Sequence, residues 1–372
     1  MVILHIIPWL QQGGAEALLA GLVRTTGDRV THRIYTLIEA EDFFDLEPGT
    51  VVSGPGSRGV ASLAMARDLH ACVAGLRPDV VHAWMYHANL ASLLVCFRVP
   101  HILWSIHSSV LTRENSKTTT RAVSALCARV SHAVPDRIVY VSNSAREFHE
   151  KHGYCADKGT VISVGVDLQR FDPTRFLARP PGAGIHRPVE IAVIARYDQV
   201  KGHHFLIDTI ARHPARERLR LHFVGQYCDT APALRDHLEQ TGLIAQSTLR
   251  GPIAAIEQVY ASVDVVVLPS SSEALPTCLI EAAAMGNLVC ASRVGEIPRL
   301  GFPKSYLFEP GDQKSCAAAL SIVIDEAAKP FAGLFLRQAV ASRFALGEVA
   351  DSYVGLYREL TKKSATSAVR LF

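Results

Sequence analysis

The chain has 372 residues, a length that suits two α/β domains of ordinary size better than a single core. Hydrophobic residues make up 49% and charged residues 20%, which is typical of a folded globular enzyme and excludes a disordered or fibrous chain. The formal net charge of +3 is too mild for general nucleic-acid binding, so we expect no nucleic-acid partner.

Cysteine usage and hydrophobic segments indicate the compartment. The eight cysteines are scattered without a Cys-x-x-Cys pair, which favours reduced thiols over a zinc site or a disulfide framework. No apolar run approaches the roughly 20 residues that span a bilayer. Met1 to Leu10 lacks the basic start and small-residue cleavage site of a signal peptide. We therefore expect a cytoplasmic protein.

Strand and helix patterns alternate along the first half of the chain. A Gly13-Gly14 turn joins the first strand to the first helix, and such a turn lets a phosphate approach the backbone. The alternation predicts an α/β fold with a doubly wound, mostly parallel sheet. The predicted strands are Val2–Pro8, Asp79–Ala83, His101–Ile106 and Arg137–Val141, and the predicted helices are Ala17–Val23 and Val60–Leu76.

The pattern stops in a segment rich in proline and glycine around Arg170 to Arg187, which is typical of a linker. A second α/β pattern follows it. Two similar halves of this kind bind a ligand in the cleft between them, where the carboxyl edges of both sheets meet. The predicted strands of the second half are Glu190–Ala195, Leu219–Gly225, Val265–Pro269 and Leu288–Ala291.

A strand, a loop and a helix follow one another between Val265 and Gly286. Pro276 suits the first turn of a helix and Gly286 suits the position just past a helix end, so we predict a helix over about 276–285. In a parallel sheet the loop before this helix lies at the carboxyl edge, where ligands bind and helix amides attract a phosphate.

Two carboxylates, Glu273 and Glu281, flank the start of this predicted helix. Glu281 lies one turn beyond Thr277 on the same face, where it can reach the two hydroxyls of a ribose. That arrangement suits a sugar nucleotide. Two solvated surface acids are the alternative, since the chain carries 35 acidic residues.

Two cations, Arg196 and Lys201, lie five positions apart directly after a predicted strand. An arginine can bond two phosphate oxygens while a lysine supplies a point charge, so the pair can neutralise a departing diphosphate without a metal. A solvated basic loop is the alternative.

The order of the motifs resembles the retaining nucleotide-sugar glycosyltransferases of glycosyltransferase family 4, which have the GT-B fold. The resemblance spans most of the chain and depends on order and spacing, because each piece alone is weak. The motifs are Gly13-Gly14-Ala15-Glu16, Arg77 to His82, Ser105-Ile106-His107, Pro135 to Ser142, Ile162 to Asp167, Phe171, Arg196 with Lys201-Gly202, Phe223-Val224-Gly225, Tyr260 with Asp264, and Glu273 to Glu281.

The resemblance implies two Rossmann-like doubly wound domains that face a central cleft. The acceptor-side domain would cover residues 1–168, a linker 169–187, and the nucleotide-sugar-binding domain 188–349. A last helix over about 350–372 would pack back on the first domain.

The resemblance also implies roles for single residues. Arg196 and Lys201 would bind the donor diphosphate and stabilise it as it leaves, Glu281 would hold the ribose, and Glu273 and His107 would lie beside the transferred sugar. A satisfied core histidine is the alternative for His107. The implied donor-binding set is Gly13, Gly14, Arg196, Lys201, Leu275, Pro276, Thr277 and Glu281, and the implied catalytic set is Glu273, His107, Arg196 and Lys201.

Members of this family transfer a hexosyl group with retention of the anomeric configuration, by a front-side route in which the departing phosphate helps deprotonate the acceptor. The resemblance therefore implies no metal and no cofactor, and a UDP-sugar is the favoured donor. The sequence departs from the family at Ala274, where glycine is common, at Asn287, near which a proline is common, and at Glu296, which replaces a frequent glycine. These departures bear on loop detail and on donor identity.

Two other functions are compatible with the same fold. One is a sugar-nucleotide epimerase or a phosphorylase of GT-B architecture, which fold alone does not distinguish from a transferase. The other is a catalytically degenerate partner subunit that only binds a nucleotide-sugar. Release of a free nucleotide separates the transferase from both.

The acceptor is expected on the N-terminal domain, and its candidate contacts are His82, Trp84, His87 and Asn89, at and after a strand end. Trp84 is placed either to stack on a sugar or to fill the core. The segment Leu111 to Val134 carries Arg113, Lys117, Arg121 and Arg129 among apolar residues, which favours a peripheral position on an inner-membrane face or a lipid-linked acceptor. An ordinary helix with a solvated face is the alternative. Surface polysaccharide or glycolipid biosynthesis is the expected pathway.

Overall fold

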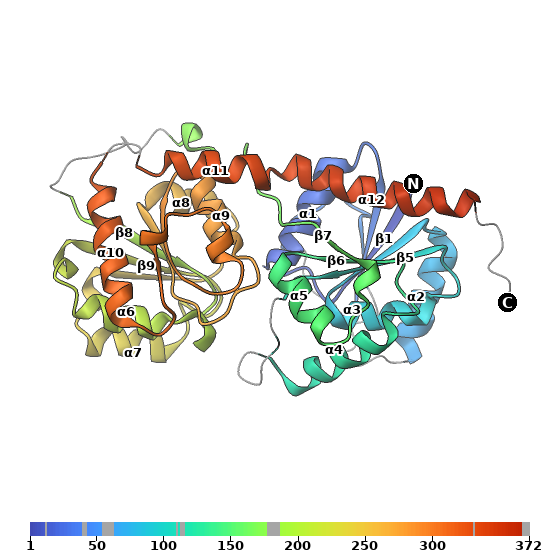
Figure 1. Ribbon diagram of the computed structural model, residues 1–372, viewed down its shortest axis with the longest axis horizontal. Helices are drawn as coiled ribbons and strands as arrows, with labels where there is room; N and C mark the ends of the chain where they lie inside the picture. Colours follow the sequence, from blue (N-terminus) through green and yellow to red (C-terminus); the bar gives the residue numbers. More distant parts are fainter. Residues whose placement is uncertain are drawn as a thin grey trace. The chain divides into compact units, whose positions relative to one another are not determined.

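The chain folds into two compact units in the computed structural model (Figure 1). The first comprises Met1–Gly165 and Leu346–Phe372, and the second comprises Val166–Ala345. The structure describes residues 1–11, 13–38, 43–53, 63–108, 111, 116–176, 187–329 and 332–366. Within these residues, each unit holds one parallel sheet with helices against it, so the predicted α/β class with two doubly wound sheets is confirmed.

The sheet of the first unit has the strand order β3-β2-β1-β4-β5-β6-β7 among the described residues, and all its pairs are parallel. Its central strands are almost continuous apolar runs, and every residue of β4 and β5 is buried, as expected for strands covered on both faces. The strands are β1 Val2–Ile7, β2 Thr31–Thr36, β3 Val51–Ser53, β4 Val80–Trp84, β5 His101–Ile106, β6 Arg137–Tyr140 and β7 Gly159–Val161.

The last helix of the chain belongs to the first unit, although the second unit precedes it in sequence. Its residues Tyr353, Val354 and Tyr357 lie in the same hydrophobic core as Ile3 of β1 and Leu19 of α1. The helices of this unit are α1 Gly14–Thr26, α2 Leu63–Leu76, α3 Met85–Ala91, α4 Thr118–Val130, α5 Asn143–Lys151 and α12 Leu346–Thr366, with the short 3-10 helices η1 Ser92–Val95 and η2 Ala156–Lys158.

The sheet of the second unit has the order β10-β9-β8-β11-β12-β13 among the described residues, again with parallel pairs. The strands are β8 Val189–Ile194, β9 Leu219–Val224, β10 Ser247–Arg250, β11 Val265–Leu268, β12 Leu288–Ser292 and β13 Leu307–Phe308. The helices are α6 His203–Ala211, α7 Pro232–Gln240, α8 Ile256–Ser262, α9 Thr277–Ala284, α10 Gln313–Ala327 and α11 Leu334–Phe344, with 3-10 helices η3 Pro173–Arg175, η4 Gln199–Lys201, η5 Arg216–Arg218, η6 Ile244–Gln246, η7 Ile297–Arg299 and η8 Lys304–Tyr306.

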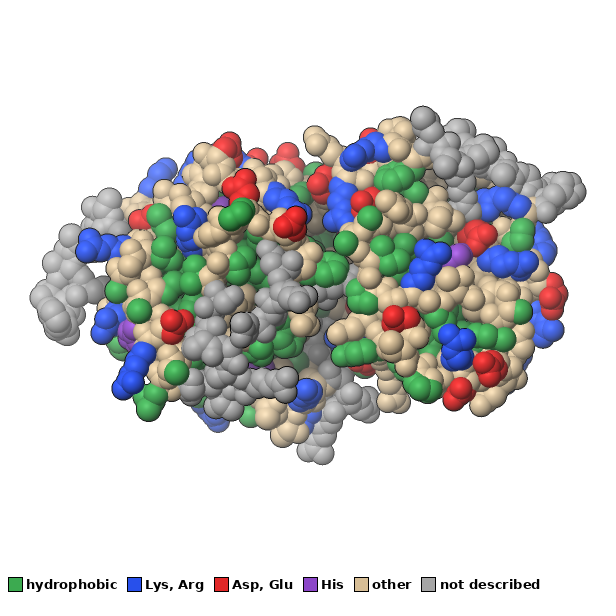
Figure 2. All heavy atoms as spheres, turned by 180° about the vertical axis from the view of Figure 1, so that it is seen from behind, with side chains coloured by type: hydrophobic (Ala, Val, Ile, Leu, Met, Phe, Trp, Pro, Cys, Tyr) green, Lys and Arg blue, Asp and Glu red, His purple; other side chains and the backbone are tan. Residues whose placement is uncertain are grey.

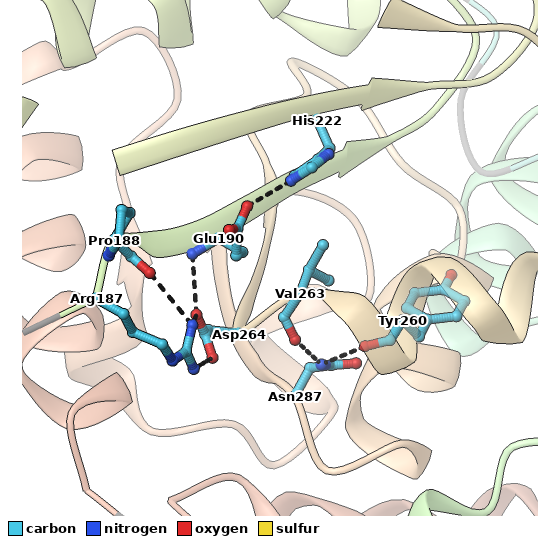
Figure 3. Close-up of polar contacts among 8 residues, drawn as sticks. All are labelled: Arg187, Pro188, Glu190, His222, Tyr260, Val263, Asp264 and Asn287. Atoms are coloured by element: carbon cyan, nitrogen blue, oxygen red, sulfur yellow. Dashed lines mark hydrogen bonds and ion pairs between the residues drawn. The ribbon is translucent and has the colours of Figure 1, made fainter. Parts of the chain in front are cut away.

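The amino ends of β8 and β11 are held together by Asp264 (Figure 3). Its carboxylate accepts hydrogen bonds from both terminal nitrogens of Arg187, at 3.0 and 2.6 Å, and from the backbone amide of Glu190 at 2.9 Å. On the neighbouring strand, His222 shares a hydrogen bond of 2.6 Å with the Glu190 carboxylate. These contacts fix the register of the central strands from one end of the sheet.

The strand order in each sheet reverses once, between β1 and β4 in the first unit and between β8 and β11 in the second. Beyond the carboxyl ends of such a strand pair, the two connections leave toward opposite sides, and this opens the crevice where doubly wound sheets bind ligands. The fold therefore defines one candidate position for a site in each unit.

Candidate functional site

Two predicted site residues meet beyond the carboxyl ends of β8 and β11. The Lys201 ammonium lies 2.6 Å from Glu273 Oε1, although the two residues are 72 positions apart. Both side chains are largely buried, with 22% of Lys201 and 10% of Glu273 exposed. A single Nζ–O contact with little water around it gives a strong, directional interaction that a second anion entering the crevice would compete for.

The loop after β8 is shaped to present Lys201. The Asp198 side chain accepts a hydrogen bond from the Val200 amide at 3.0 Å and so caps η4, of which Lys201 is the last residue. The next residue, Gly202, has a φ of 69°, and a Cβ there would lie 2.2 Å from the Pro269 carbonyl oxygen. Only glycine allows this close approach of the two loops, which the bond from the Ser271 amide to the Val200 carbonyl also holds at 2.8 Å.

The loop after β12 supports Glu273 in the same manner. Gly295 has a φ of 53°, and a Cβ at this position would lie 1.8 Å from the Glu273 carbonyl oxygen. Glu296, which follows, is 7% exposed and lies 3.4 Å from Arg299. The departure from the family pattern at Glu296 therefore leaves the glycine that this contact needs in place.

Arg196 lies on the same loop as Lys201 but is far more accessible. Its side chain is 58% exposed, and its guanidinium lies 3.2 Å from the Asp198 carboxylate. Because Asp198 also caps η4, it connects the positions of the two predicted cations. The second unit thus brings Arg196, Lys201 and Glu273 to one edge of its sheet.

Helix α9 adds backbone donors to this edge. It begins at Thr277 with Pro276 in extended conformation as its N-cap, one residue later than the sequence predicted. The first amides of a helix have no partner within the helix and carry partial positive charge, so they suit a phosphate or a sugar hydroxyl. Leu275 is 8% exposed and anchors the approach to the helix.

Glu281 lies on the second turn of α9, and its Oε2 accepts a hydrogen bond of 2.7 Å from the Tyr260 hydroxyl. Burial raises the pKa of Glu281 to about 7, against the opposing effects of this hydrogen bond and of Arg170. A buried carboxylate with a neutral donor on one oxygen is suited to accept hydrogen bonds from ribose hydroxyls through the other.

The predicted phosphate turn of the first unit opens α1. Gly13 is the N-cap of the helix and Gly14 is its first residue, which is exposed. A Cβ on Gly13 would lie 2.2 Å from Oε2 of Glu16, so the carboxylate of Glu16 folds back over the turn. Burial raises the pKa of Glu16 above its ordinary value. An incoming phosphate at Gly13 and Gly14 would meet this carboxylate.

His107 follows β5 and stacks on Trp84, with ring centroids 5.2 Å apart and an angle of 19° between the planes. Its Nε2 is buried and has no hydrogen-bond partner among the described residues. Burial lowers the pKa of His107 to about 4, so the ring is neutral at physiological pH. A neutral imidazole with one unsatisfied nitrogen can bind a hydroxyl that reaches it, and the implied place of His107 beside a sugar stays a prediction.

The acceptor-side candidates His82 and Trp84 lie in the core instead of at an accessible surface. Both are fully buried. His82 contacts the Tyr357 hydroxyl at 2.8 Å and Ser105 Oγ at 2.6 Å, and the Trp84 indole donates to His5 Nδ1 at 3.1 Å. Neither side chain can contact an acceptor directly, because Tyr353 and Tyr357 of α12 pack against them.

The other two acceptor-side candidates differ from each other. His87 is exposed on α3. Asn89 is fully buried, and its amide lies 3.0 and 3.2 Å from the carbonyl oxygens of Ala83 and Met85, which it binds as a donor. Met85 has a φ of 70°, which is rare for a residue with a side chain, so Asn89 stabilises a strained turn at the end of β4. His87 is the one member of this set with an accessible side chain.

Several residues that build these sites had no predicted role. Asp198, Gly202 and Gly295 position Lys201 and Glu273, and Tyr260 contacts Glu281. The signal for Gly202 and Gly295 was their place just after predicted strands, where tight turns require glycine. Tyr260 belonged to a motif of the resemblance, but its contact with Glu281 had no signal, because the partner lies 21 positions later on another helix.

Charges are interspersed on the face that Figure 2 shows, where basic and acidic side chains alternate over both units. In the described part of the chain, no three His, Cys, Asp or Glu side chains gather where they could hold a metal ion. Among the same residues, no helix has the length and hydrophobicity to cross a membrane.

Two parallel, doubly wound units, with charged side chains beyond the strand ends at the second switch point, are the architecture of the GT-B fold. The family model described as Glycosyltransferase Family 4 matches residues 12–170, and the model described as Glycosyl transferases group 1 matches residues 188–326. The chain belongs to glycosyltransferase family 4.

Solved structures share this fold over nearly the whole chain. The HepE protein of Anabaena, in a crystal structure with UDP-glucose, has a TM-score of 0.82 at 19% identity, over 96% of this chain and all of that one. A sucrose-phosphate synthase from Thermosynechococcus elongatus has a TM-score of 0.81 at 19% identity, over 98% and 100% of the two chains.

Curated relatives are more similar in sequence. A D-inositol 3-phosphate glycosyltransferase of Geodermatophilus obscurus is 29% identical over 254 residues, which are 64% of this chain and 56% of that relative. A glycogen synthase of Mycobacterium tuberculosis is 28% identical over 305 residues, 76% of this chain and 69% of that protein. The chain thus spans little more than half the length of the first of these relatives.

Proposed function

We propose that the protein transfers a sugar from a UDP-sugar to a glycan or lipid-linked acceptor, with retention of configuration and without a metal. The observation that carries this proposal is the meeting of Lys201 and Glu273 at the switch point of the second unit, next to Arg196 and the N-terminus of α9. These are a pair of cations, a set of backbone amides and a carboxylate, the groups that a diphosphate and a sugar require.

In this proposal the cations bind the diphosphate, and the carboxylates bind the hydroxyls of the sugar and of the ribose. Lys201 and Arg196 neutralise the diphosphate as the bond to the sugar breaks, which is where negative charge develops. Glu273 accepts hydrogen bonds from the sugar once Lys201 turns toward the phosphate. Glu281 binds the ribose. The departing phosphate oxygen takes the proton of the acceptor hydroxyl as the new bond forms on the same face of the sugar. The neutral ring of His107 is suited to bind a sugar hydroxyl without adding charge.

The first test is a calorimetric and thermal-shift screen against UDP, GDP and ADP and their common sugar conjugates, with EDTA present throughout. We expect one nucleotide to bind and to raise the melting temperature, and Arg196→Ala and Glu281→Ala to weaken that binding. No binding of any of them to the intact protein would overturn the proposed donor site. NMR of the product's anomeric proton tests retention, and release of free UDP separates transfer from epimerisation.

We also propose a peripheral position on an anionic membrane face for an enzyme of surface polysaccharide or glycolipid assembly. Helix α4 contains no acidic residue, and its exposed surface carries Arg129 and the 43% exposed Leu126, with Lys117 just before it. Cations around an exposed apolar side chain favour an anionic lipid surface. Arg113, which the sequence placed in the same segment, lies outside the described residues. Co-sedimentation with vesicles of anionic lipid, compared with neutral vesicles, tests this position.

A further inference from the structure

Tyr260 has a completely buried side chain, and the proposed transfer reaction assigns no role to it. Its hydroxyl donates to Glu281 Oε2 at 2.7 Å, and among the described residues it is the one side chain that hydrogen bonds this carboxylate. The Tyr260 ring packs edge-on against Phe171, with ring centroids 5.7 Å apart. A buried tyrosine hydroxyl needs a partner, and here that partner is the predicted ribose ligand.

Helix α8, which carries Tyr260, is fixed at both ends. At its carboxyl end, the Asn287 side-chain amide donates to the carbonyl oxygens of Tyr260 at 2.9 Å and of Val263 at 2.6 Å (Figure 3). At its amino end, Arg170 Nε lies 2.9 Å from the Glu257 carboxylate. Asn287 stands at one of the positions where the sequence departs from the family pattern, and a proline there could not make these two bonds.

The contact matters because a glutamate carboxylate is otherwise poorly fixed. The last torsion of a glutamate side chain is broad, so an isolated carboxylate turns easily about it. A hydroxyl that holds Oε2 from a rigid helix sets the plane of the carboxylate and leaves Oε1 in a defined direction. A vicinal diol needs such a fixed pair of acceptors, because both of its hydroxyls must bond at once.

The neighbours of Glu281 shift its pKa in opposite directions. Burial of the carboxyl raises its pKa, and Glu257 on α8 acts in the same direction, whereas the Tyr260 hydroxyl and Arg170 lower it. The pKa of Tyr260 is itself raised well above its ordinary value by burial, so its hydroxyl keeps its proton. Cys278, on the same helix α9, is a further titratable neighbour of Glu281, and burial keeps its pKa above the ordinary value.

We propose that Tyr260 is a positioning residue for ribose recognition, which holds the Glu281 carboxylate so that its second oxygen meets the hydroxyls of the nucleotide. The inference rests on the proposed function and deepens it. Glu281 binds the ribose diol of a nucleoside diphosphate, and Tyr260 orients the Glu281 carboxylate for this contact. Asn287 holds α8, and with it Tyr260, in place. A 2′-deoxynucleotide cannot complete this set of bonds.

The experiment is calorimetry of UDP and 2′-deoxy-UDP binding to the intact protein and to Tyr260→Phe, from pH 5.5 to 8.5, with GDP and its 2′-deoxy form in parallel. We expect Tyr260→Phe to weaken UDP binding about tenfold, as for the loss of a hydrogen bond to a charged group. The preference for UDP over 2′-deoxy-UDP should shrink at the same time. UDP affinity falls as Glu281 takes up a proton, and in the variant this fall should move to higher pH, because one bond that favours the carboxylate is lost.

Tyr306→Phe is the matched control, since Tyr306 is a similarly buried tyrosine of the same unit whose ring packs against Phe335. It should leave affinity, ribose preference and pH profile unchanged. The variant Glu281→Gln, which keeps the side-chain volume, completes a double-mutant cycle with Tyr260→Phe, and a coupling energy near zero would contradict the proposal.

The outcomes separate the two proposals. If neither UDP nor GDP binds the intact protein, the proposed function fails and this inference fails with it. If one of them binds, but Tyr260→Phe has the same affinity, ribose preference and pH midpoint as the intact protein, the donor site stands and the role of Tyr260 is overturned. A loss of affinity with unchanged ribose preference and pH midpoint also overturns it, because a general packing defect would have that effect.

Discussion

The strands β8 and β11 are joined by an ion pair near each of their two ends, and the two pairs differ in how their charges are used. At the amino ends, Asp264 binds the forked guanidinium of Arg187 and the Glu190 amide (Figure 3). Beyond the carboxyl ends, Lys201 meets Glu273 through a single contact. A forked, three-bond pair has one stable geometry, whereas a lysine on a flexible stem can change partner.

The surroundings of the two ion pairs also differ, and they favour a structural role for the first and ligand binding for the second. The Arg187 and Asp264 pair connects the start of one strand to the start of the next. The Lys201 and Glu273 pair lies beside the exposed Arg196 and before the first amides of α9. Ion pairs of similar length therefore serve strand register at one edge and, in our proposal, ligand binding at the other.

The largest expected effect comes from removing the charges at the carboxyl edge. We expect Lys201→Met to lower kcat/KM for the nucleotide-sugar by about 10²-fold or more, because a donor that stabilises charge developing in the transition state is lost. Steady-state kinetics of UDP release measures this, with Lys201→Arg as the variant that keeps the charge.

Stability is separated from function by a second variant. Lys201→Met leaves the Glu273 carboxylate without its lysine, which also costs stability. Lys201→Met with Glu273→Gln removes both charges, so we expect a melting temperature near that of the wild type while activity stays lost. Full activity in this double variant would show that the pair is structural and would end the contrast between the two edges.

The reverse result is expected at the amino edge. Asp264→Asn leaves Arg187 without its charged partner, so the free energy of unfolding should fall by about 2 kcal/mol. Urea denaturation measures this loss. The dissociation constant for UDP should stay within about twofold of the wild type, since Asp264 lies at the other end of the strands. A loss of UDP affinity as large as that of Lys201→Met would contradict the division of tasks.

The positions of the candidate site residues were easier to predict from the sequence in the second unit than in the first, and the reason is physical. Arg196, Lys201, Glu273 and Glu281 carry charge in loops and helix starts beside apolar strands, and a charge at such a place is seldom buried without a purpose. The carboxyl-edge rule then brings these loops together without any knowledge of side-chain packing. Sequence reasoning could therefore predict the fold and the loops that meet at this edge, where Lys201 contacts Glu273, whereas the roles of these residues in binding stay predictions.

The same reasoning did not decide the place of His82 and Trp84, which are both fully buried. Their residue types and their place at a strand end fit an acceptor contact and a core side chain equally well. What decides between the two is α12, because the Tyr357 hydroxyl that binds His82 comes from a helix 275 positions later. Tertiary contacts of that range leave no local pattern in the sequence, and the same holds for Tyr260 and Glu281.

In the core of the first unit, a chain of hydrogen bonds runs from the end of β4 through β1 and β2 to the last turn of α1, and it fixes the protons of two neutral histidines. The Trp84 indole donates to His5 Nδ1, so His5 must carry its proton on Nε2 and donate it to His32 Nδ1, 2.9 Å away. His32 then donates from Nε2 to Thr26 Oγ1 at 2.8 Å, and Thr26 donates to the Leu22 carbonyl at 2.7 Å. One proton added to either histidine breaks this chain of donors.

Acid should therefore destabilise the protein through this chain, and per pH unit this is the smallest change in free energy that we predict. Burial lowers the pKa of His32 to about 4, below its ordinary value of about 6.5 in an unfolded chain. Between these two values the unfolded state binds a proton that the folded state does not. Stability is therefore fully present above about pH 6.5 and is lost as the pH falls toward 4, by at most about 1.4 kcal/mol per pH unit for each such histidine.

The measurement is the free energy of unfolding from urea melts at pH 7, 6 and 5, for the wild type, for His32→Gln, and for His132→Gln as an exposed control. His32→Gln should flatten the pH dependence by up to about 1.4 kcal/mol per pH unit, because it removes one titrating group, and His132→Gln should not change it. Equal slopes in all three proteins would mean that His32 takes up its proton in the folded state as easily as in the unfolded one, and the neutral chain from Trp84 to Leu22 could then not be the arrangement in solution.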